Sequence, residues 1–157
     1  MTAAVTRSYR FSASHRLHTS ALSDTENARL FGKCNNPYGH GHNYELAVTV
    51  RGAVDEQTGV VISINRLDCY VLNRVIRDFD GRNMNLDIRE FEGVVPTTEN
   101  VTRAVADRLR QGWDEEFGRG GPRLERVHVQ ETARNGFDLI IEEPLLSRLR
   151  QEVDRSL

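Results

Sequence analysis

The chain has 157 residues and a formal net charge of −2, with 38% hydrophobic and 28% charged residues. These proportions are typical of one water-soluble globular domain and exclude a disordered or fibrous chain. We expect no membrane span, because no apolar run approaches the roughly 20 residues required, and no signal peptide, because the N-terminal residues lack its apolar segment. A pI near 6.2 argues against a nucleic-acid partner. Two cysteines are too few for a disulfide framework, so we expect a cytoplasmic protein.

The first half of the chain predicts two long strands and a helix. Alternation of apolar and polar residues indicates strands over 5–15 and 42–54, a turn over 55–59 and a short returning strand over 60–64. Capping residues at 23–26 indicate a short helix in the long connection between the two strands. Apolar residues four apart then predict a helix over 66–79, capped by Asn65.

The second half predicts another helix and a hairpin. A helix opens at Pro96-Thr97-Thr98, and its apolar stripe continues to Phe117. Strands follow over 123–131 and 137–141, joined by a type I′ turn at Asn135-Gly136. The order ββααββ predicts an α+β domain over 1–144, in which an antiparallel four-stranded sheet carries two helices on one face. Residues 145–157 predict a C-terminal helical extension of that domain.

Three histidines form the strongest chemical signal. His40 and His42 are two residues apart at the start of a strand and therefore point to one face. His15 ends the preceding strand. If those strands pair, three imidazoles converge with a fourth position open, which is a catalytic zinc arrangement. Spacing alone leaves a second interpretation open, in which His40 and His42 are incidental residues of a turn and His15 is an ordinary strand-end residue.

Other residues with chemical potential each have a simpler structural explanation. Cys34 lies just before the histidine pair and is either a reactive thiol or a small buried side chain. Cys69 is interpreted as a packing residue in a helix. Glu131 at a strand end is either solvated or a two-oxygen acceptor for a planar heterocycle, and Asp80 follows a helix as an ordinary solvated acid.

Four collinear segments resemble the 6-pyruvoyl tetrahydropterin synthase family. They are Phe11-Ser-Ala-Ser-His-Arg-Leu17, Leu30-Phe-Gly-Lys-Cys-Asn-Asn-Pro-Tyr-Gly-His-Gly-His-Asn-Tyr44, Thr97-Thr-Glu-Asn-Val101 and Glu131-Thr132. The resemblance runs from about Arg7 to Ile141. The long spacing between Cys34 and the histidine pair is closer to this family than to the related 6-carboxy-tetrahydropterin synthases.

The resemblance implies a tunnelling fold (T-fold) subunit that assembles into a homohexamer, a dimer of trimers. It implies a zinc-dependent carbon–oxygen lyase that eliminates triphosphate from 7,8-dihydroneopterin triphosphate and rearranges its side chain, a step in tetrahydrobiopterin biosynthesis. The residues that match the family's site are zinc ligands His15, His40 and His42, catalytic Cys34 and Asp80, and substrate-binding Glu131, Thr97, Thr98 and Glu99.

One position departs from the family pattern. The family has an Asp-His pair after the first long helix, whereas this chain has Asp80-Gly81. A missing general acid or base typically costs 10²–10⁴-fold in rate. His18 or a water molecule is one candidate to replace the missing histidine as the acid or base. Two alternative functions for the chain are a lyase or cyclase acting on another pterin-like or carbonyl substrate, and a non-catalytic pterin-binding protein.

Overall fold

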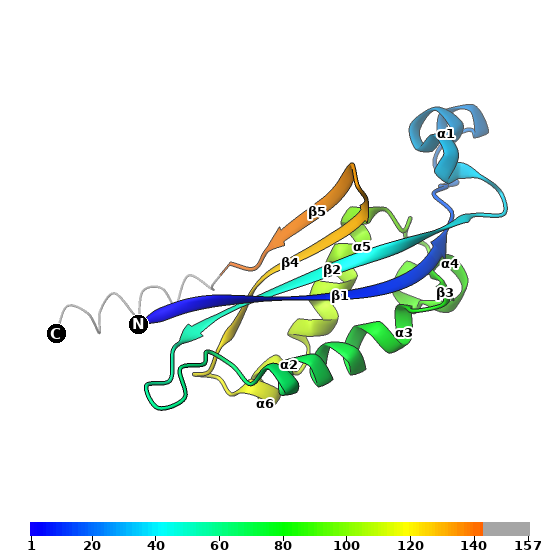
Figure 1. The fold of residues 1–157 in the computed structure, drawn as a ribbon. Helices are drawn as coiled ribbons and strands as arrows, with labels where there is room; N and C mark the ends of the chain where they lie inside the picture. Colours follow the sequence, from blue (N-terminus) through cyan, green and yellow to red (C-terminus); the bar gives the residue numbers. More distant parts are fainter. Residues whose placement is uncertain (143–157) are drawn as a thin grey trace.

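The computed structural model describes residues 1–142, which form one sheet with helices on one face (Figure 1). The strands are β1 (Thr2–His15), β2 (His40–Ala53), β3 (Arg82–Asn83), β4 (Arg123–Thr132) and β5 (Asn135–Ile140). The helices are α1 (Asp24–Phe31), α2 (Ile64–Val71), α3 (Arg77–Phe79), α4 (Met84–Asp87), α5 (Thr98–Arg110) and α6 (Trp113–Phe117). A π-helical turn, Leu72–Ile76, joins α2 to α3, and two 3-10 turns span Gly32–Asn35 and Arg89–Phe91. The expected C-terminal extension, 145–157, lies outside the described residues.

The sheet has five strands in the order β3-β1-β2-β4-β5. The prediction of a four-stranded antiparallel sheet therefore missed one strand. The additional strand, β3, runs parallel to β1. It is held there because Asp80 Oδ1 accepts a hydrogen bond from Ser12 N (2.8 Å) and Gly81 N donates to Ser12 O (2.7 Å). A two-residue strand has no alternation that sequence inspection could detect. The α+β class and the four long antiparallel strands are confirmed.

Three local predictions were wrong. Residues 60–64 do not form a strand, since α2 begins at Ile64 and Ser63 rather than Asn65 caps it. The long second helix is divided, because Gly112 adopts φ +88° between α5 and α6. The β4–β5 hairpin does not use a type I′ turn at Asn135-Gly136, because Asn135 already pairs with Thr132.

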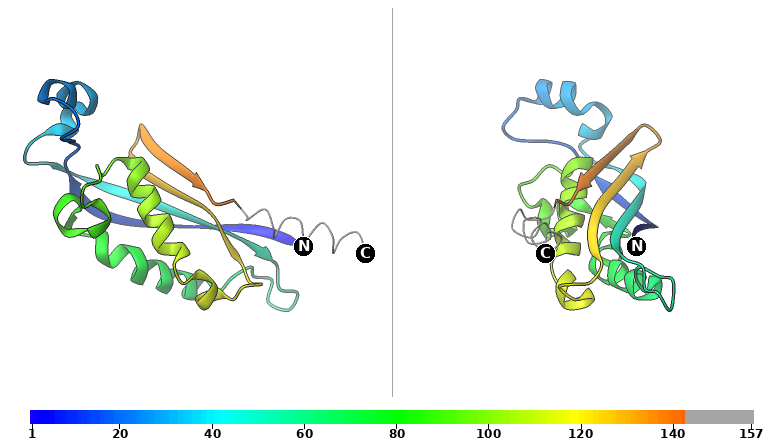
Figure 2. Two further views of the ribbon diagram at one scale, coloured as in Figure 1. Left: turned by 180° about the vertical axis from the view of Figure 1, so that it is seen from behind. Right: turned by 90° about the vertical axis from the view of Figure 1, so that its left-hand side faces the viewer.

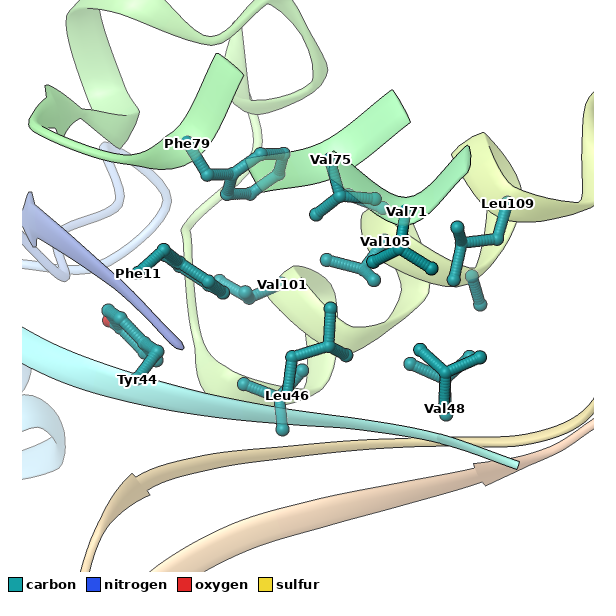
Figure 3. Packing of buried hydrophobic residues seen from close by; sticks show 14 of the residues in the cluster. Phe11, Tyr44, Leu46, Val48, Val71, Val75, Phe79, Val101, Val105 and Leu109 are labelled. Atoms are coloured by element: carbon teal, nitrogen blue, oxygen red, sulfur yellow. The ribbon is translucent and has the colours of Figure 1, made fainter. Parts of the chain in front are cut away.

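The helices cover one face of the sheet, as expected (Figure 2). Alternate residues of β1 and β2 point toward them, and these pack against α2, α3 and α5 (Figure 3). Phe11 stacks on Tyr44 with ring centroids 5.0 Å apart and meets Phe79 edge-on. In the described part of the chain, no helix is long and apolar enough to cross a membrane.

The long connection between β1 and β2 is ordered around one buried amide. Ser23 and Glu26 form the expected capping box of α1, which lies beyond the end of the sheet. Asn27 is fully buried. It accepts from Thr19 N at 2.8 Å and donates to Thr19 O, Leu22 O and Ser23 O. Both hydrogens of the amide nitrogen and the amide oxygen are therefore engaged, so the loop has a fixed shape next to the histidines.

A partly exposed ion pair joins β1 to α2 and predicts that the stability of the protein depends on pH in the acid range. Arg7 donates two hydrogen bonds to Asp68 (2.6 and 3.1 Å), and Tyr9 donates a third (2.8 Å). The bond from Arg7 holds the pKa of Asp68 below its usual value. Stability from this contact is therefore present above the unfolded carboxyl pKa of about 3.9 and is lost as pH falls through the lower folded value.

We therefore expect Asp68→Asn to be less stable than the parent at pH 7, with the difference narrowing below about pH 4. Urea unfolding at several pH values measures this difference. Glu56→Gln, which removes an exposed loop carboxylate, serves as the control. If the difference in unfolding free energy between the parent and Asp68→Asn stayed constant down to pH 2, the charge of the Asp68 carboxylate would not contribute to stability.

Candidate metal centre

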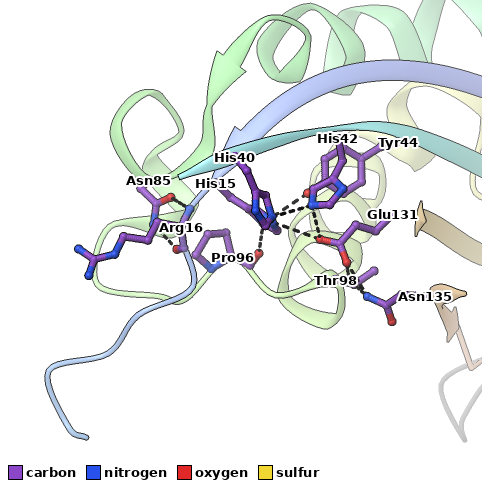
Figure 4. A network of polar contacts seen from close by, with 10 residues as sticks. All are labelled: His15, Arg16, His40, His42, Tyr44, Asn85, Pro96, Thr98, Glu131 and Asn135. Carbon is purple, nitrogen blue, oxygen red and sulfur yellow. Dashed lines mark hydrogen bonds and ion pairs between the residues drawn. The ribbon is translucent and has the colours of Figure 1, made fainter. Parts of the chain in front are cut away.

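The pairing of β1 with β2 brings the three predicted histidines together. The register places His15 directly opposite His40 and Ala13 opposite His42, so all three imidazoles point to the helix-covered face. The Nε2 atoms of His15 and His40 are 3.2 Å apart, and those of His40 and His42 are 2.9 Å apart (Figure 4). The expected convergence of three ring nitrogens is therefore present.

Hydrogen bonding fixes which nitrogen of His15 is available. Its Nδ1 lies 2.9 Å from Pro96 O, which can only accept, so Nδ1 carries the hydrogen and Nε2 presents its lone pair to the cluster. Burial lowers the pKa of both His15 and His42. Both imidazoles are thus favoured in the neutral form that metal binding requires.

The spacing of these atoms fits a tetrahedral metal ion. Nitrogen ligands about 2.0–2.1 Å from Zn²⁺ at tetrahedral angles are about 3.3 Å from one another. The separations of 3.2 and 2.9 Å between Nε2 atoms are close to that value. Among residues 1–142, His15 belongs to both groups of side chains that can hold a metal: one with Cys34 and His40, the other with His42 and Glu131. A cluster of neutral imidazoles suits zinc among other transition metals.

Glu131 is directed at the histidines by an irregularity in β4. Gln130 pairs with Gly136 and Thr132 with Asn135, so Glu131 is the extra residue of a β-bulge. Its Oε1 lies 3.3 Å from His15 Nε2 and 3.4 Å from His42 Nε2. Its Oε2 accepts from Thr98 Oγ1 at 3.0 Å and from Asn135 Nδ2 at 2.5 Å. Both carboxylate oxygens are therefore engaged by groups of this chain.

Cys34 lies beside the same imidazoles. Its Sγ is within 4.8 Å of ligand nitrogens of His15 and His40, and its carbonyl accepts from Leu17 N at 2.8 Å. Burial and the negative charge of Glu131 raise the pKa of the Cys34 thiol. In the absence of a cation the thiol is therefore protonated at neutral pH. Cys69 is exposed on α2, so the expectation that it packs in the core was wrong.

The other expected residues take different positions. Thr97 caps α5 by accepting from Asn100 N, and Glu99 is exposed in the first turn of that helix. Asp80 binds Ser12 at the edge of β1, and His128 faces the opposite side of the sheet, where it contacts Asp138. No interaction that the structure shows joins Asp80 or Glu99 to the imidazoles of this chain.

Three residues of the centre were not identified from the sequence. Pro96 supplies the carbonyl that orients His15, and Asn135 binds Glu131. Tyr44 is fully buried, and its hydroxyl lies 3.4 Å from His15 Nδ1. Of these three, only Tyr44 could have been identified from the sequence, because it lies two residues after His42 on the same strand and therefore points to the same face.

Gly39 permits the close approach of the histidine loop to β1, and this makes it sensitive to substitution. It adopts φ +70°, and a Cβ there would lie 2.8 Å from His15 O. We expect Gly39→Ala to lower the unfolding free energy by more than about 1 kcal/mol, because strain and a backbone clash act together. Chemical denaturation measures this loss. Gly59→Ala, also at positive φ but with open space around it, is the control for strain alone; equal losses in both variants would contradict a role for the clash.

The fold and the site define a T-fold protein with a histidine-rich centre. The sequence model named 6-pyruvoyl tetrahydropterin synthase matches residues 4–140. The chain belongs to this family. It is 48% identical to human 6-pyruvoyl tetrahydrobiopterin synthase over 109 residues, which are 69% of this chain and 75% of that protein. The *Dictyostelium discoideum* synthase is 37% identical over 134 residues, 85% of this chain and 93% of that protein.

Solved structures show the same fold. The structure of *Caenorhabditis elegans* 6-pyruvoyl tetrahydropterin synthase superimposes with a TM-score of 0.79 at 35% identity, covering 90% of this chain and 97% of that one. A *Plasmodium vivax* 6-pyruvoyl tetrahydropterin synthase has a TM-score of 0.66 at 15% identity, covering 91% of this chain and 99% of that one. At 15% identity, the likeness supports the T-fold alone.

Proposed function

We propose that this protein is a zinc-dependent carbon–oxygen lyase that converts 7,8-dihydroneopterin triphosphate to a 6-pyruvoyl tetrahydropterin with loss of triphosphate. The observation that carries the proposal is the convergence of three imidazole nitrogens, two of which lie beside the Cys34 thiol, in a chain of the synthase family. His15, His40 and His42 hold the metal in this proposal. Zn²⁺ supplies Lewis acidity, which polarises bound hydroxyl oxygens and acidifies the neighbouring C–H bonds.

Cys34 is proposed to move protons between carbons of the substrate side chain. Its Sγ shares a cluster with His15 and His40, so a group bound at the imidazoles is within reach of the thiol. Because burial and Glu131 hold the thiol in its protonated form, Cys34 needs a nearby positive charge to become a base. Proton removal and return by one residue account for an internal rearrangement that needs no nicotinamide.

Glu131, Thr97, Thr98 and Glu99 are proposed to form the pterin-binding wall. An ionised carboxylate accepts two N–H groups of a planar heterocycle. Glu131 performs this role only if Thr98 and Asn135 release its Oε2. Until then its carboxylate remains against His15 and His42 and stabilises positive charge there. Glu99 is exposed in the first turn of α5.

Asp80 is proposed to act from a neighbouring subunit of a homohexamer, since its carboxylate binds Ser12 and no interaction that the structure shows joins it to the imidazoles of its own chain. The absence of an imidazole beside it favours a second candidate function. Gly81 adopts φ +72°, and a Cβ there would meet open space. This space suits a zinc-dependent lyase or cyclase with a different pterin-like or carbonyl substrate.

Product analysis separates the two candidates. Zinc-loaded protein is incubated with 7,8-dihydroneopterin triphosphate, and the products are identified by mass spectrometry. We expect inorganic triphosphate and the pyruvoyl product in equal amounts. Unchanged substrate with protein that holds stoichiometric zinc would reject the first candidate and direct the search to other substrates. Release of triphosphate without the pyruvoyl product would show that the protein accepts this substrate but does not complete the side-chain rearrangement, which also contradicts the first candidate.

A further inference from the structure

The β-bulge that carries Glu131 is tied from the open face of the sheet by the side chain of Gln130. Gln130 and His128 lie on that face because they alternate along β4 with buried valines that face the helices. The side-chain amide of Gln130 donates from Nε2 to the carbonyl oxygen of Thr132. Glu131 lies between the two residues that this hydrogen bond joins, so the bond spans the bulge and limits its freedom.

Hydrogen-bond partners at both ends fix the orientation of the Gln130 amide. The carbonyl of Thr132 can only accept, so Nε2 is the end that faces it and Oε1 is the other end. Oε1 lies 3.0 Å from His128 Nε2, which donates to it. His128 Nδ1 in turn lies 3.2 Å from Asp138 Oδ1 on β5. A chain of polar contacts therefore links the bulge in β4 to the neighbouring strand.

Gly136 leaves the space that this amide occupies. It lies directly opposite Gln130 in the β4–β5 register. A Cβ at Gly136 would lie 2.7 Å from Gln130 Oε1 and 3.0 Å from His128 Cε1. The φ angle of Gly136 is not positive, so the backbone there does not itself require glycine. The absence of a side chain at position 136 therefore serves to admit the amide of Gln130.

The hold on the backbone is independent of the bonds that hold the carboxylate of Glu131. The carboxylate is bound on the helix-covered side by Thr98 and by Asn135, whose Nδ2 also donates to Thr98 Oγ1 at 2.8 Å (Figure 4). A pterin that takes Oε2 must displace those two groups. The bond from Gln130 to Thr132 O is on the other face and persists when they are displaced. Because the extra residue of a bulge is left unpaired in the strand ladder, this bond is what keeps Glu131 directed at the site.

We propose that Gln130 is a positioning residue for pterin recognition, which holds the bulge so that the carboxylate of Glu131 meets the ring of a bound pterin. This inference rests on the proposed function, in which Glu131 accepts N–H groups of the pterin. Gln130 acts from the opposite face of the sheet and contacts neither the ligand nor the metal. Its loss therefore weakens binding of the pterin ring and leaves zinc binding unaltered.

The first test measures the affinity of zinc-loaded protein for neopterin, a stable pterin without phosphates, by fluorescence titration. Gln130→Ala should bind neopterin about 3- to 10-fold more weakly than the parent, the usual effect of losing one hydrogen bond to a ligand. Its zinc affinity, measured by chelator competition, should equal that of the parent. Gln57→Ala, which removes an exposed loop glutamine, is the matched control and should bind both ligands as the parent does.

A double-mutant cycle with Glu131→Ala separates positioning from a general structural effect. Because Gln130 acts through Glu131, Gln130→Ala should cause no further loss of neopterin affinity in the Glu131→Ala background. The same loss in both backgrounds would overturn the proposal, and so would parental neopterin affinity in Gln130→Ala. A loss of zinc affinity by the same factor as neopterin affinity would indicate a general disturbance and would also overturn it.

Gly136→Ala provides a second variant if Gln130→Ala does not fold. It displaces the Gln130 amide and leaves Gln130 itself in the chain. Gly120→Ala is the control, since Gly120 also has no positive φ and a Cβ there would meet open space. We expect Gly136→Ala to lose neopterin affinity as Gln130→Ala does and Gly120→Ala to keep it. Parental affinity in Gly136→Ala would contradict the positioning role.

Failure of the proposed function gives a different result, because the parent protein then does not bind neopterin. In that case crystal structures of the metal-free parent and Gln130→Ala proteins decide whether Gln130 positions Glu131. The carboxylate should lie beside His15 and His42 in the parent, as it does here, and should be displaced in Gln130→Ala. An unchanged position of Glu131 in Gln130→Ala would reject the positioning role.

Discussion

His42→Ala is expected to lose more than about 100-fold in zinc affinity, together with turnover. Substitution of residues that merely orient a metal ligand already costs 10–100-fold, so removing a ligand costs more. His42 is the favoured position for this test because its side chain is 17% exposed, whereas that of His15 is 0% exposed. Alanine at position 42 therefore opens a space that reaches solvent, and it should disturb folding less than alanine at position 15, which would leave a closed cavity.

Competition with a chromophoric chelator measures the zinc affinity of each variant. His128→Ala is the matched control, because His128 lies on the opposite face of the sheet and contacts Asp138. It should bind zinc as the parent does. Retention of parental affinity by His42→Ala would exclude the three-histidine centre, and equal losses in both variants would indicate a general loss of structure.

Cys34→Ala is expected to lose about 10²–10⁴-fold in turnover of 7,8-dihydroneopterin triphosphate while zinc remains bound. The thiol is the proton carrier in the proposed reaction, and three imidazoles are sufficient to hold the metal. The second cysteine offers a matched control, because Cys69 is exposed on α2. Cys69→Ala should have parental turnover. A Cys34→Ala protein with parental turnover would show that the reaction does not use this thiol.

The titration of Cys34 provides an independent readout. Burial and Glu131 both raise the thiol pKa, so alkylation of the metal-free protein should become fast only above the usual cysteine range. Glu131→Gln removes one of these causes and should shift the midpoint to lower pH. Iodoacetamide labelling of Cys34 against pH, performed in a Cys69→Ala background, measures the shift. An unchanged midpoint would mean that the carboxylate and the thiol do not interact.

Much of the architecture follows from patterns within single elements. Alternation in the two long strands, four-residue spacing in the helices and the Ser23–Glu26 capping box all report local geometry, and the structure confirms them. The wrong predictions concern places where local signals compete. Ser63 and Asn65 are both good caps, and the apolar stripe from Val101 to Phe117 continues through the break at Gly112. The two-residue strand β3 forms only because Asp80 and Gly81 bind Ser12.

The two-strand, two-helix, two-strand order and the shared face of His40 and His42 follow from the residue pattern, because alternation along a strand fixes the face to which each side chain points. How those residues meet depends on long-range pairing. The register of β1 with β2 sets His15 opposite His40, the bulge in β4 turns Glu131 toward both His15 and His42, and the chain before α5 places Pro96 O against His15. Each of these contacts joins segments distant in sequence. Pairing register and bulges depend on the packed sheet as a whole, so no local pattern specifies them.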